Sequence, residues 1–128
     1  MILTPYFDLH EFVCPCCGCL PDADDQETGG MDVALLLILH GIRWKINKPL
    51  IVCSGFRCIS HNDDCGGVQN SQHLFGRAAD VYADGVSVDT IAHLAREYGA
   101  DGVGVYYGQG FVHIDTRGHE DARAEWEG

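Results

Sequence analysis

The sequence predicts an α+β fold in which helices pack on a small, mainly antiparallel sheet, within a single domain over residues 1–128. The length suits one domain with one core. Apolar and aromatic residues make up 46% of the chain, which favours a globular fold over disorder. Two segments have the length and pattern of helices, and several shorter apolar runs have the length of strands.

The N-terminal segment predicts an irregular, Cys-rich arm laid over the core. Residues 1–30 show little periodicity, are rich in Cys, Pro, Asp and Gly, and end in the breaker Thr28-Gly29-Gly30. The stretch Met1–Phe12 lacks a basic segment followed by an apolar one, so it does not have the pattern of a secretory signal. We therefore expect cytoplasmic synthesis without a signal peptide, and any export would need outside help.

The next segment predicts a helix and then a strand. Residues 31–47 have helical length and are almost wholly apolar from Val33 to Leu39, which favours a central, buried helix. Asn47-Lys48-Pro49 ends this helix, and residues 50–54 form a short apolar run that suits a buried strand.

The middle of the chain predicts a long loop, a strand and a second helix. Residues 55–76 are polar, Gly-rich and unperiodic, and loops of this length inside compact domains are usually functional. Residues 78–82 predict a strand. Ser87 suits a helix N-cap and is followed by apolar residues at helical spacing, so we expect a helix over 87–98 that ends at Gly99.

The last third predicts a pair of neighbouring strands and a loose end. Residues 102–107 and 111–116 are strand-like, and Gly108-Gln109-Gly110 between them is typical of a hairpin turn. The tail over 118–128 is charged and is expected to be frayed.

The charge of the chain disfavours several classes of partner. Nineteen acidic residues against 8 basic ones give a formal net charge of −11, and an acidic surface repels nucleic-acid phosphates. The longest apolar stretch, Ala34–Leu39, is too short to span a bilayer. We therefore expect no nucleic-acid partner and no membrane span, and we expect a monomer.

The cysteines raise the question of a second site. Seven cysteines cannot all pair within one chain, and a chain without a signal peptide usually keeps its thiols reduced. Four are crowded into the arm and three lie near the strand at 50–54: Cys14, Cys16, Cys17, Cys19, Cys53, Cys58 and Cys65. A structural zinc completed by Cys53 and Cys58, buried thiols, and a disulfide to the Cys53 and Cys58 region all stay open.

Two short motifs carry the residues with metal chemistry. Ser71-Gln-His73-Leu-Phe-Gly76-Arg-Ala78-Ala-Asp80 places a His in the loop and an Asp just inside a strand. In Phe111-Val-His113-Ile-Asp115, strand alternation puts His113 and Asp115 on one face and the two aliphatic residues on the other. Two His and one carboxylate are a ligand set typical of catalytic zinc, with the fourth position left to water.

These motifs, in this order and together with Ser54-Gly-Phe-Arg57 and Gly102-Val-Gly104-Val-Tyr106, resemble the zinc D-alanyl-D-alanine carboxypeptidases. That family shares its fold with the Hedgehog signalling domain, and the resemblance, to its small bacterial or prophage members, covers roughly residues 6–117. It implies that His73, Asp80 and His113 bind Zn²⁺. It also implies that Arg57 helps to hold the substrate and the developing oxyanion, and that Ser71 contacts the substrate.

The chain departs from the family pattern at the proton-transfer group. Several relatives carry a Glu three residues before the last His ligand or a second His two residues before it, and here those positions are Gly110 and Phe111. Asp115 is the substitute as catalytic base, but it could equally orient His113. Tyr106, Tyr107 or a group in the loop 55–76 are the alternative proton carriers.

The resemblance implies a hydrolase, a metallopeptidase that cleaves a bond next to a D-amino acid in the stem peptide of peptidoglycan. Such an enzyme would act on the cell wall once released or exported. The alternative is a catalytically silent zinc-binding module of the same fold. A weaker one is a cysteine-zinc interaction domain in which the His and Asp cluster is incidental.

Overall fold

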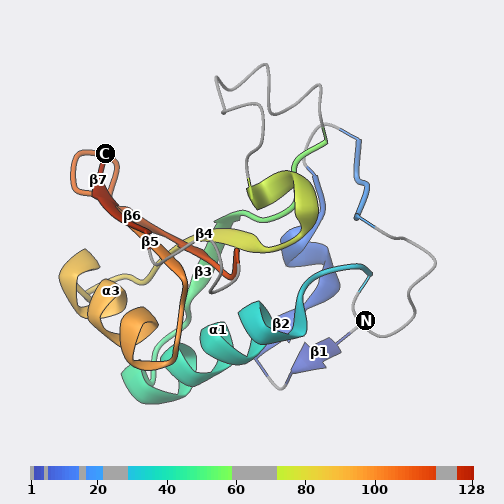
Figure 1. Cartoon of the computed structure of the whole chain (residues 1–128). Helices are drawn as coiled ribbons and strands as arrows, with labels where there is room; N and C mark the ends of the chain where they lie inside the picture. Colours follow the sequence, from blue (N-terminus) through green and yellow to red (C-terminus); the bar gives the residue numbers. More distant parts are fainter. Residues whose placement is uncertain (1, 5, 15–16, 22–28, 59–71, 118–123) are drawn as a thin grey trace.

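The structure, a computed structural model, describes residues 2–4, 6–14, 17–21, 29–58, 72–117 and 124–128. The fold is α+β, as predicted from the sequence. Helices α1 and α3 lie on the same side of a five-stranded sheet, and a small two-stranded sheet lies beside α1 (Figure 1). The elements are β1 Ile2–Thr4, β2 Phe7–Asp8, the 3₁₀ helix η1 Leu9–Phe12, α1 Val33–Ile46, β3 Ile51–Ser54, the 3₁₀ helix η2 Gln72–Phe75, β4 Ala78–Tyr82, α3 Val88–Glu97, β5 Gly102–Tyr106, β6 Phe111–Asp115 and β7 Ala124–Glu127.

The main sheet has the strand order β3-β4-β6-β5-β7. Every neighbouring pair is antiparallel except β5 and β7, which are parallel. The central strand β6 pairs with both β4 and β5, and its register puts His113 directly opposite Asp80 on one side and Gly104 on the other. The sheet therefore brings together two motifs that lie more than thirty residues apart in the sequence.

The two faces of the sheet have different chemistry. One face packs beneath the helices and contributes the aliphatic side chains of alternate residues to the core: Ala79, Val81, Val103, Val105, Val112 and Ile114. Because successive strand residues point to opposite faces, the residues between them face away from the helices. Asp80, His113 and Asp115 are among these residues and are buried without facing the aliphatic core.

The helix boundaries agree with the predicted ones to within two residues. Helix α1 ends at Asn47, which has left-handed backbone (φ 53°), and the Ser87 side chain caps α3 by accepting from Thr90 N at 3.1 Å. The expectation of a central, buried helix is confirmed only for one side of α1. Its core side is buried, but Leu37 and Trp44 on the outer side are 62% and 65% exposed.

The described parts of the tail and of the arm form regular elements that the sequence did not predict. Within the tail, residues 124–127 form β7 at the edge of the sheet, so the prediction of a frayed end is wrong there. Strand β7 pairs with β5, a partner that its own sequence does not reveal. Within the arm, Asp8 and Glu11 form a capping box at η1, and Phe12 C=O accepts from Phe56 N–H at 2.9 Å. This bond fastens the arm to the segment after β3.

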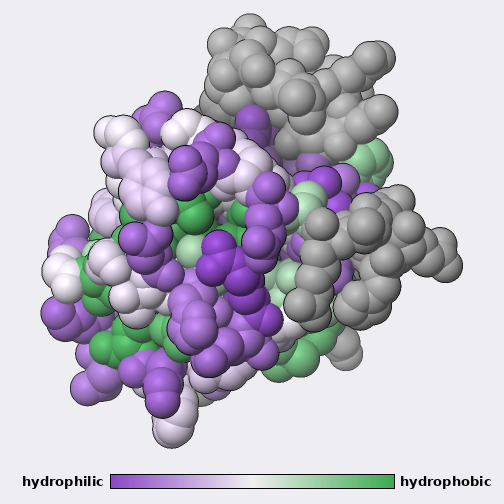
Figure 2. Space-filling model, turned by 60° about the vertical axis from the view of Figure 1, so that its left-hand side comes forward, coloured by the Kyte–Doolittle hydropathy of each residue, from purple (hydrophilic) through white to green (hydrophobic). Residues whose placement is uncertain are grey.

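Hydrophilic residues dominate the face shown in Figure 2, and apolar residues appear there in separate patches. Among the residues that the structure describes, no helix is long and apolar enough to cross a membrane.

Candidate metal centre

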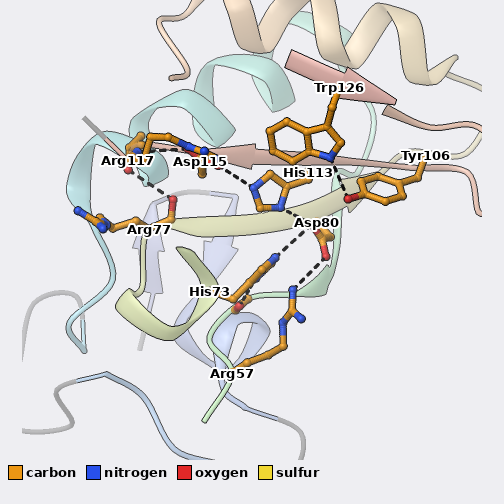
Figure 3. A network of polar contacts seen from close by, with 11 residues as sticks. Arg57, His73, Arg77, Asp80, Tyr106, His113, Asp115, Arg117 and Trp126 are labelled. Atoms are coloured by element: carbon orange, nitrogen blue, oxygen red, sulfur yellow. Dashed lines mark hydrogen bonds and ion pairs between the residues drawn. The ribbon is translucent and has the colours of Figure 1, made fainter. Parts of the chain in front are cut away.

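His73, Asp80 and His113 come together on the face of the sheet opposite the helices. His73 comes from η2, Asp80 from β4 and His113 from β6, and all three are at least nine-tenths buried. Each offers one ligand atom, and these atoms lie within 4.8 Å of one another. Asp80 Oδ1 is 3.3 Å from His73 Nε2 and 3.0 Å from His113 Nδ1 (Figure 3). The sequence motifs thus converge on one carboxylate between two imidazoles.

Each imidazole is held by its other ring nitrogen. His73 Nδ1 lies 2.7 Å from the Gly55 carbonyl oxygen, which requires the proton on Nδ1 and leaves Nε2 as the acceptor facing Asp80. His113 Nε2 lies 2.8 Å from Asp115 Oδ2, so a proton on Nε2 leaves Nδ1 facing Asp80. Buried metal-binding His residues are typically oriented in this way by a carbonyl or a carboxylate.

The surroundings shift the pKa values of the three residues in different directions. Burial lowers the pKa of His73. Burial alone would lower the pKa of His113, but hydrogen bonds to Asp115 and Asp80 outweigh it and raise that pKa. Burial alone would raise the pKa of Asp80, but the hydrogen bond to His113 and the nearby His73 imidazole hold it below its usual range. The cluster therefore favours the ionised form of Asp80 and the protonated form of His113.

Asp115 has a second cation on its other side. Arg117 donates to both carboxylate oxygens, from Nε to Oδ1 at 2.9 Å and from Nη2 to Oδ2 at 2.6 Å. The Arg117 backbone N–H also donates to Oδ1 at 3.2 Å. Burial alone would raise the pKa of Asp115, but Arg117 and His113 hold it below its usual range. Asp115 is thus a buried anion whose two oxygens are both engaged.

Arg57 lies at the other end of the cluster. Its Nη2 is 3.9 Å from Asp80 Oδ2, and its side chain is largely buried. The Arg57 backbone N–H donates to the His73 carbonyl at 3.2 Å, so the segment after β3 supports both residues. The polar network runs from Arg57 through Asp80 and His113 to Asp115 and Arg117 (Figure 3).

Trp126 and Arg117 are site neighbours that the sequence analysis missed. The Trp126 ring from β7 lies 5.0 Å from the His113 ring, and its Nε1 donates to the Tyr106 hydroxyl at 2.9 Å. Arg117 Cζ lies 5.4 Å from the same indole. A signal for Arg117 was present, because it continues the alternation of His113 and Asp115. Trp126 had none beyond being an aromatic residue in a charged tail.

Glycines in β5 make room on this face. A Cβ on Gly102 would meet the Asp115 carboxylate, and one on Gly104 would meet the Trp126 indole, both closer than van der Waals contact allows. These two glycines alternate with core valines, so each side chain they lack would point to the metal-site face.

The other residues predicted to contact the substrate or to carry a proton lie in different places. Ser71 and most of the loop 55–76 lie outside the described residues. Tyr106 lies on the site face and stacks on Phe111, with ring centroids 4.5 Å apart. Tyr107 instead donates to Asp89 of α3 at 2.5 Å.

The donor set suits a divalent metal. Two imidazoles and one carboxylate, spaced within 4.8 Å and oriented from outside, match the three protein ligands of open zinc sites. The buried Asp80 charge also favours a cation.

Comparison with known proteins agrees with this geometry. A family model described as Peptidase M15 matches residues 5–115. The peptidoglycan L,D-endopeptidase MepK of Escherichia coli strain K12 is 36% identical over 74 residues, which are 54% of this chain and 41% of that protein. The zinc D-Ala-D-Ala carboxypeptidase of Streptomyces albus G is 40% identical over 53 residues, 41% of this chain and 21% of that protein. Each match spans less than half the length of the relative. Because the family model covers most of the chain, this protein belongs to the Peptidase M15 family.

Proposed function

We propose that this protein is a zinc-dependent peptidase that hydrolyses a bond next to a D-amino acid in the peptide part of peptidoglycan. The observation that carries the proposal is the buried cluster of His73, Asp80 and His113 with Arg57 beside it. Membership of the Peptidase M15 family supports it, as do two relatives named for peptidoglycan and D-Ala-D-Ala. When bound, zinc supplies a Lewis acid and a water that ionises near neutral pH.

Arg57 is proposed to hold the substrate. Its guanidinium lies at the edge of the cluster and has donors suited to a carboxylate or to an oxygen that gains negative charge. In a protein with only 8 basic residues, few other cations are available for that role. Donors aimed at a developing oxyanion typically contribute 10²–10³-fold to turnover.

Asp115 is proposed to position His113 rather than to act as the base. It lies against the Nε2 of His113, whereas Asp80 lies against the Nδ1. Both Asp115 oxygens already accept from Arg117. To take a proton from the attacking water, Asp115 would have to give up part of this buried ion pair. Among the two tyrosines, Tyr106, which faces the site, is then favoured as the proton carrier over Tyr107, which bonds to α3. A group in the loop 55–76 is the other candidate.

A catalytically silent zinc-binding module is the second candidate function. The observation that favours it is Phe111, which occupies a position where several relatives carry a His and which stacks on Tyr106. Metal would bind equally well in both cases, so only turnover separates them.

The test is incubation of purified, zinc-loaded protein with muropeptides of defined structure, followed by mass spectrometry. The proposal expects loss of a terminal D-amino acid or cleavage of a peptide cross-link, and chelator or His113→Ala should abolish it. A zinc-loaded protein that leaves every muropeptide intact would support the silent module instead. The mass of the product names the bond that is cut.

A further inference from the structure

A second group of thiol ligands lies where the N-terminal arm meets the segment after β3. The sulfur atoms of Cys14, Cys17 and Cys58 lie within 4.8 Å of one another. Cys14 is fully buried, Cys58 is partly buried and packs against the core, and Cys17 is exposed. The thiols of three cysteines from two distant parts of the chain thus lie close together at the edge of the core.

The arm forms a tight turn around this point. Cys14 and Cys17 have the Cys-x-x-Cys spacing that structural zinc sites use. The Gly18 N–H donates to the Cys14 carbonyl at 2.7 Å, and the Cys14 N–H donates to the Cys19 carbonyl at 2.9 Å. Gly18 has φ +72°, a conformation that glycine adopts without strain. The turn therefore presents both sulfurs to the same side.

The distances between the sulfurs suit a tetrahedral ion. Cys14 Sγ and Cys58 Sγ are 3.6 Å apart. Two thiolates on one zinc, each at about 2.3 Å, would be about 3.8 Å apart at the tetrahedral angle. The Cys58 backbone N–H also donates to Cys14 Sγ at 3.4 Å, a contact that stabilises a thiolate.

Cys19 adds a fourth thiol next to this group. Its Sγ donates to the Cys17 carbonyl at 3.7 Å. Cys53 is engaged elsewhere, because its thiol donates to the Asp80 carbonyl at 3.2 Å.

We propose that Cys14, Cys17 and Cys58 bind a second, structural zinc ion, with Cys19 placed to complete its coordination. Thiolates select zinc over harder cations, and binding releases the thiol protons. The ion would fasten the arm to residues 55–58, which hold His73 through the Gly55 carbonyl and also carry Arg57. It would thus brace the metal centre from outside.

The first test is metal content after purification under reducing, zinc-replete conditions. Wild type should contain about two equivalents of zinc, whereas Cys17→Ser and Cys58→Ser should each contain about one. Cys53→Ser is the matched control, since it removes a thiol outside the group, and should keep about two. One equivalent in wild type, unchanged in Cys17→Ser, would overturn the proposal.

The second test uses wild type alone and so does not depend on a variant that folds. With zinc bound, Cys17 should resist alkylation despite its exposure, and chelator should restore its reaction. Cobalt in place of zinc should give a thiolate charge-transfer band in the near ultraviolet. A reactive Cys17 in zinc-loaded protein, no such band, or a Cys14–Cys58 disulfide in reduced preparations would each contradict the site.

Discussion

At the scale of single residues, His113 lies between two carboxylates, Asp80 and Asp115. Its Nδ1 faces the Asp80 carboxylate and its Nε2 faces Asp115, which is itself paired with Arg117. A cation at the metal centre would compete with the proton that Asp80 and Asp115 favour on His113. Metal binding at this site should therefore become weaker as the pH falls.

Arg57→Ala should retain zinc and fold but lose about 10²–10³-fold in turnover, because the guanidinium contacts the cluster without being a ligand. Zinc content and muropeptide turnover, measured side by side, check this. Arg57→Lys is the matched control, since it keeps the charge but loses the planar pair of donors, and it should recover only part of the activity. Full turnover in Arg57→Ala would show that Arg57 only braces its loop.

Asp115→Asn should weaken zinc binding by about 10- to 100-fold, as expected for a residue that orients a metal-binding His. Activity should then recover when zinc is added in excess. The measurement is a zinc titration against a competing chelator, together with turnover at saturating zinc. Unchanged zinc affinity with a 10²–10⁴-fold fall in turnover would instead identify Asp115 as the base.

The same carboxylate gives a pH dependence in the metal-free protein. The pKa of Asp115 is lower in the folded chain than in the unfolded chain, so the unfolded chain binds more protons in acid. The stabilisation is complete above the unfolded pKa of about 3.9 and is lost as the pH falls towards the folded value. We expect the free energy of unfolding to fall less steeply below about pH 4 in Asp115→Asn. Urea titrations at several pH values give the free energy of unfolding of both proteins. If that free energy falls equally steeply with decreasing pH in wild type and in Asp115→Asn, the prediction is wrong.

At the scale of elements, the glycines of strand β5 leave space for the side chains of Asp115 and Trp126. Gly104→Ala should destabilise the fold by about 1–3 kcal/mol, the usual cost of overpacking, because its Cβ would meet the Trp126 indole. In a Trp126→Ala background the same change should cost much less. Urea midpoints of the four proteins measure this coupling. Equal costs in both backgrounds would show that β7 does not hold Trp126 against β5.

Gly102→Ala tests the other half of that strand. The new methyl group would displace the Asp115 carboxylate, so zinc affinity should fall. Gly108→Ala is the control, because among the described residues no atom beyond its chain neighbours lies within 4 Å of its Cβ position, and it should bind zinc normally. A zinc titration in which Gly102→Ala matches Gly108→Ala would contradict the placement of Asp115.

The elements that the sequence predicted are those with a strong local pattern. Alternation and flanking turns located β4, β5 and β6 to within a residue, and these strands position Asp80 and His113. The family resemblance is confirmed by the Peptidase M15 match. Strand β7 was missed because Ala124–Glu127 is short, has two acidic residues and depends on a distant partner, β5. The outer side of α1 was misjudged because an unbroken apolar run does not show which residues face solvent.

At the scale of the whole molecule, the thiol cluster and the His and Asp cluster are two places where the folded chain offers ligands that the unfolded chain does not hold together. A cation that binds only the folded state stabilises it by an amount that grows with free metal. In a chain with a net charge of −11, a cation at the His and Asp cluster also reduces self-repulsion, whereas the thiol site loses its protons on binding. Metal should therefore contribute to the fold as well as to the proposed chemistry.

The dependence of the free energy of unfolding on free zinc gives the number of zinc sites without any assay of activity. Above its dissociation constant, each zinc that binds only the folded chain adds about 1.4 kcal/mol to the free energy of unfolding per tenfold rise in free zinc. Wild type should show about twice that slope, and His113→Ala and Cys58→Ser should each show about half the wild-type slope. Urea unfolding in buffered zinc, at levels below those that the unfolded thiols bind, gives the values. A wild-type slope that Cys58→Ser leaves unchanged would eliminate the thiolate site, whereas one that His113→Ala leaves unchanged would eliminate the metal centre on the sheet. Because each variant removes a different site, failure of one leaves the other standing.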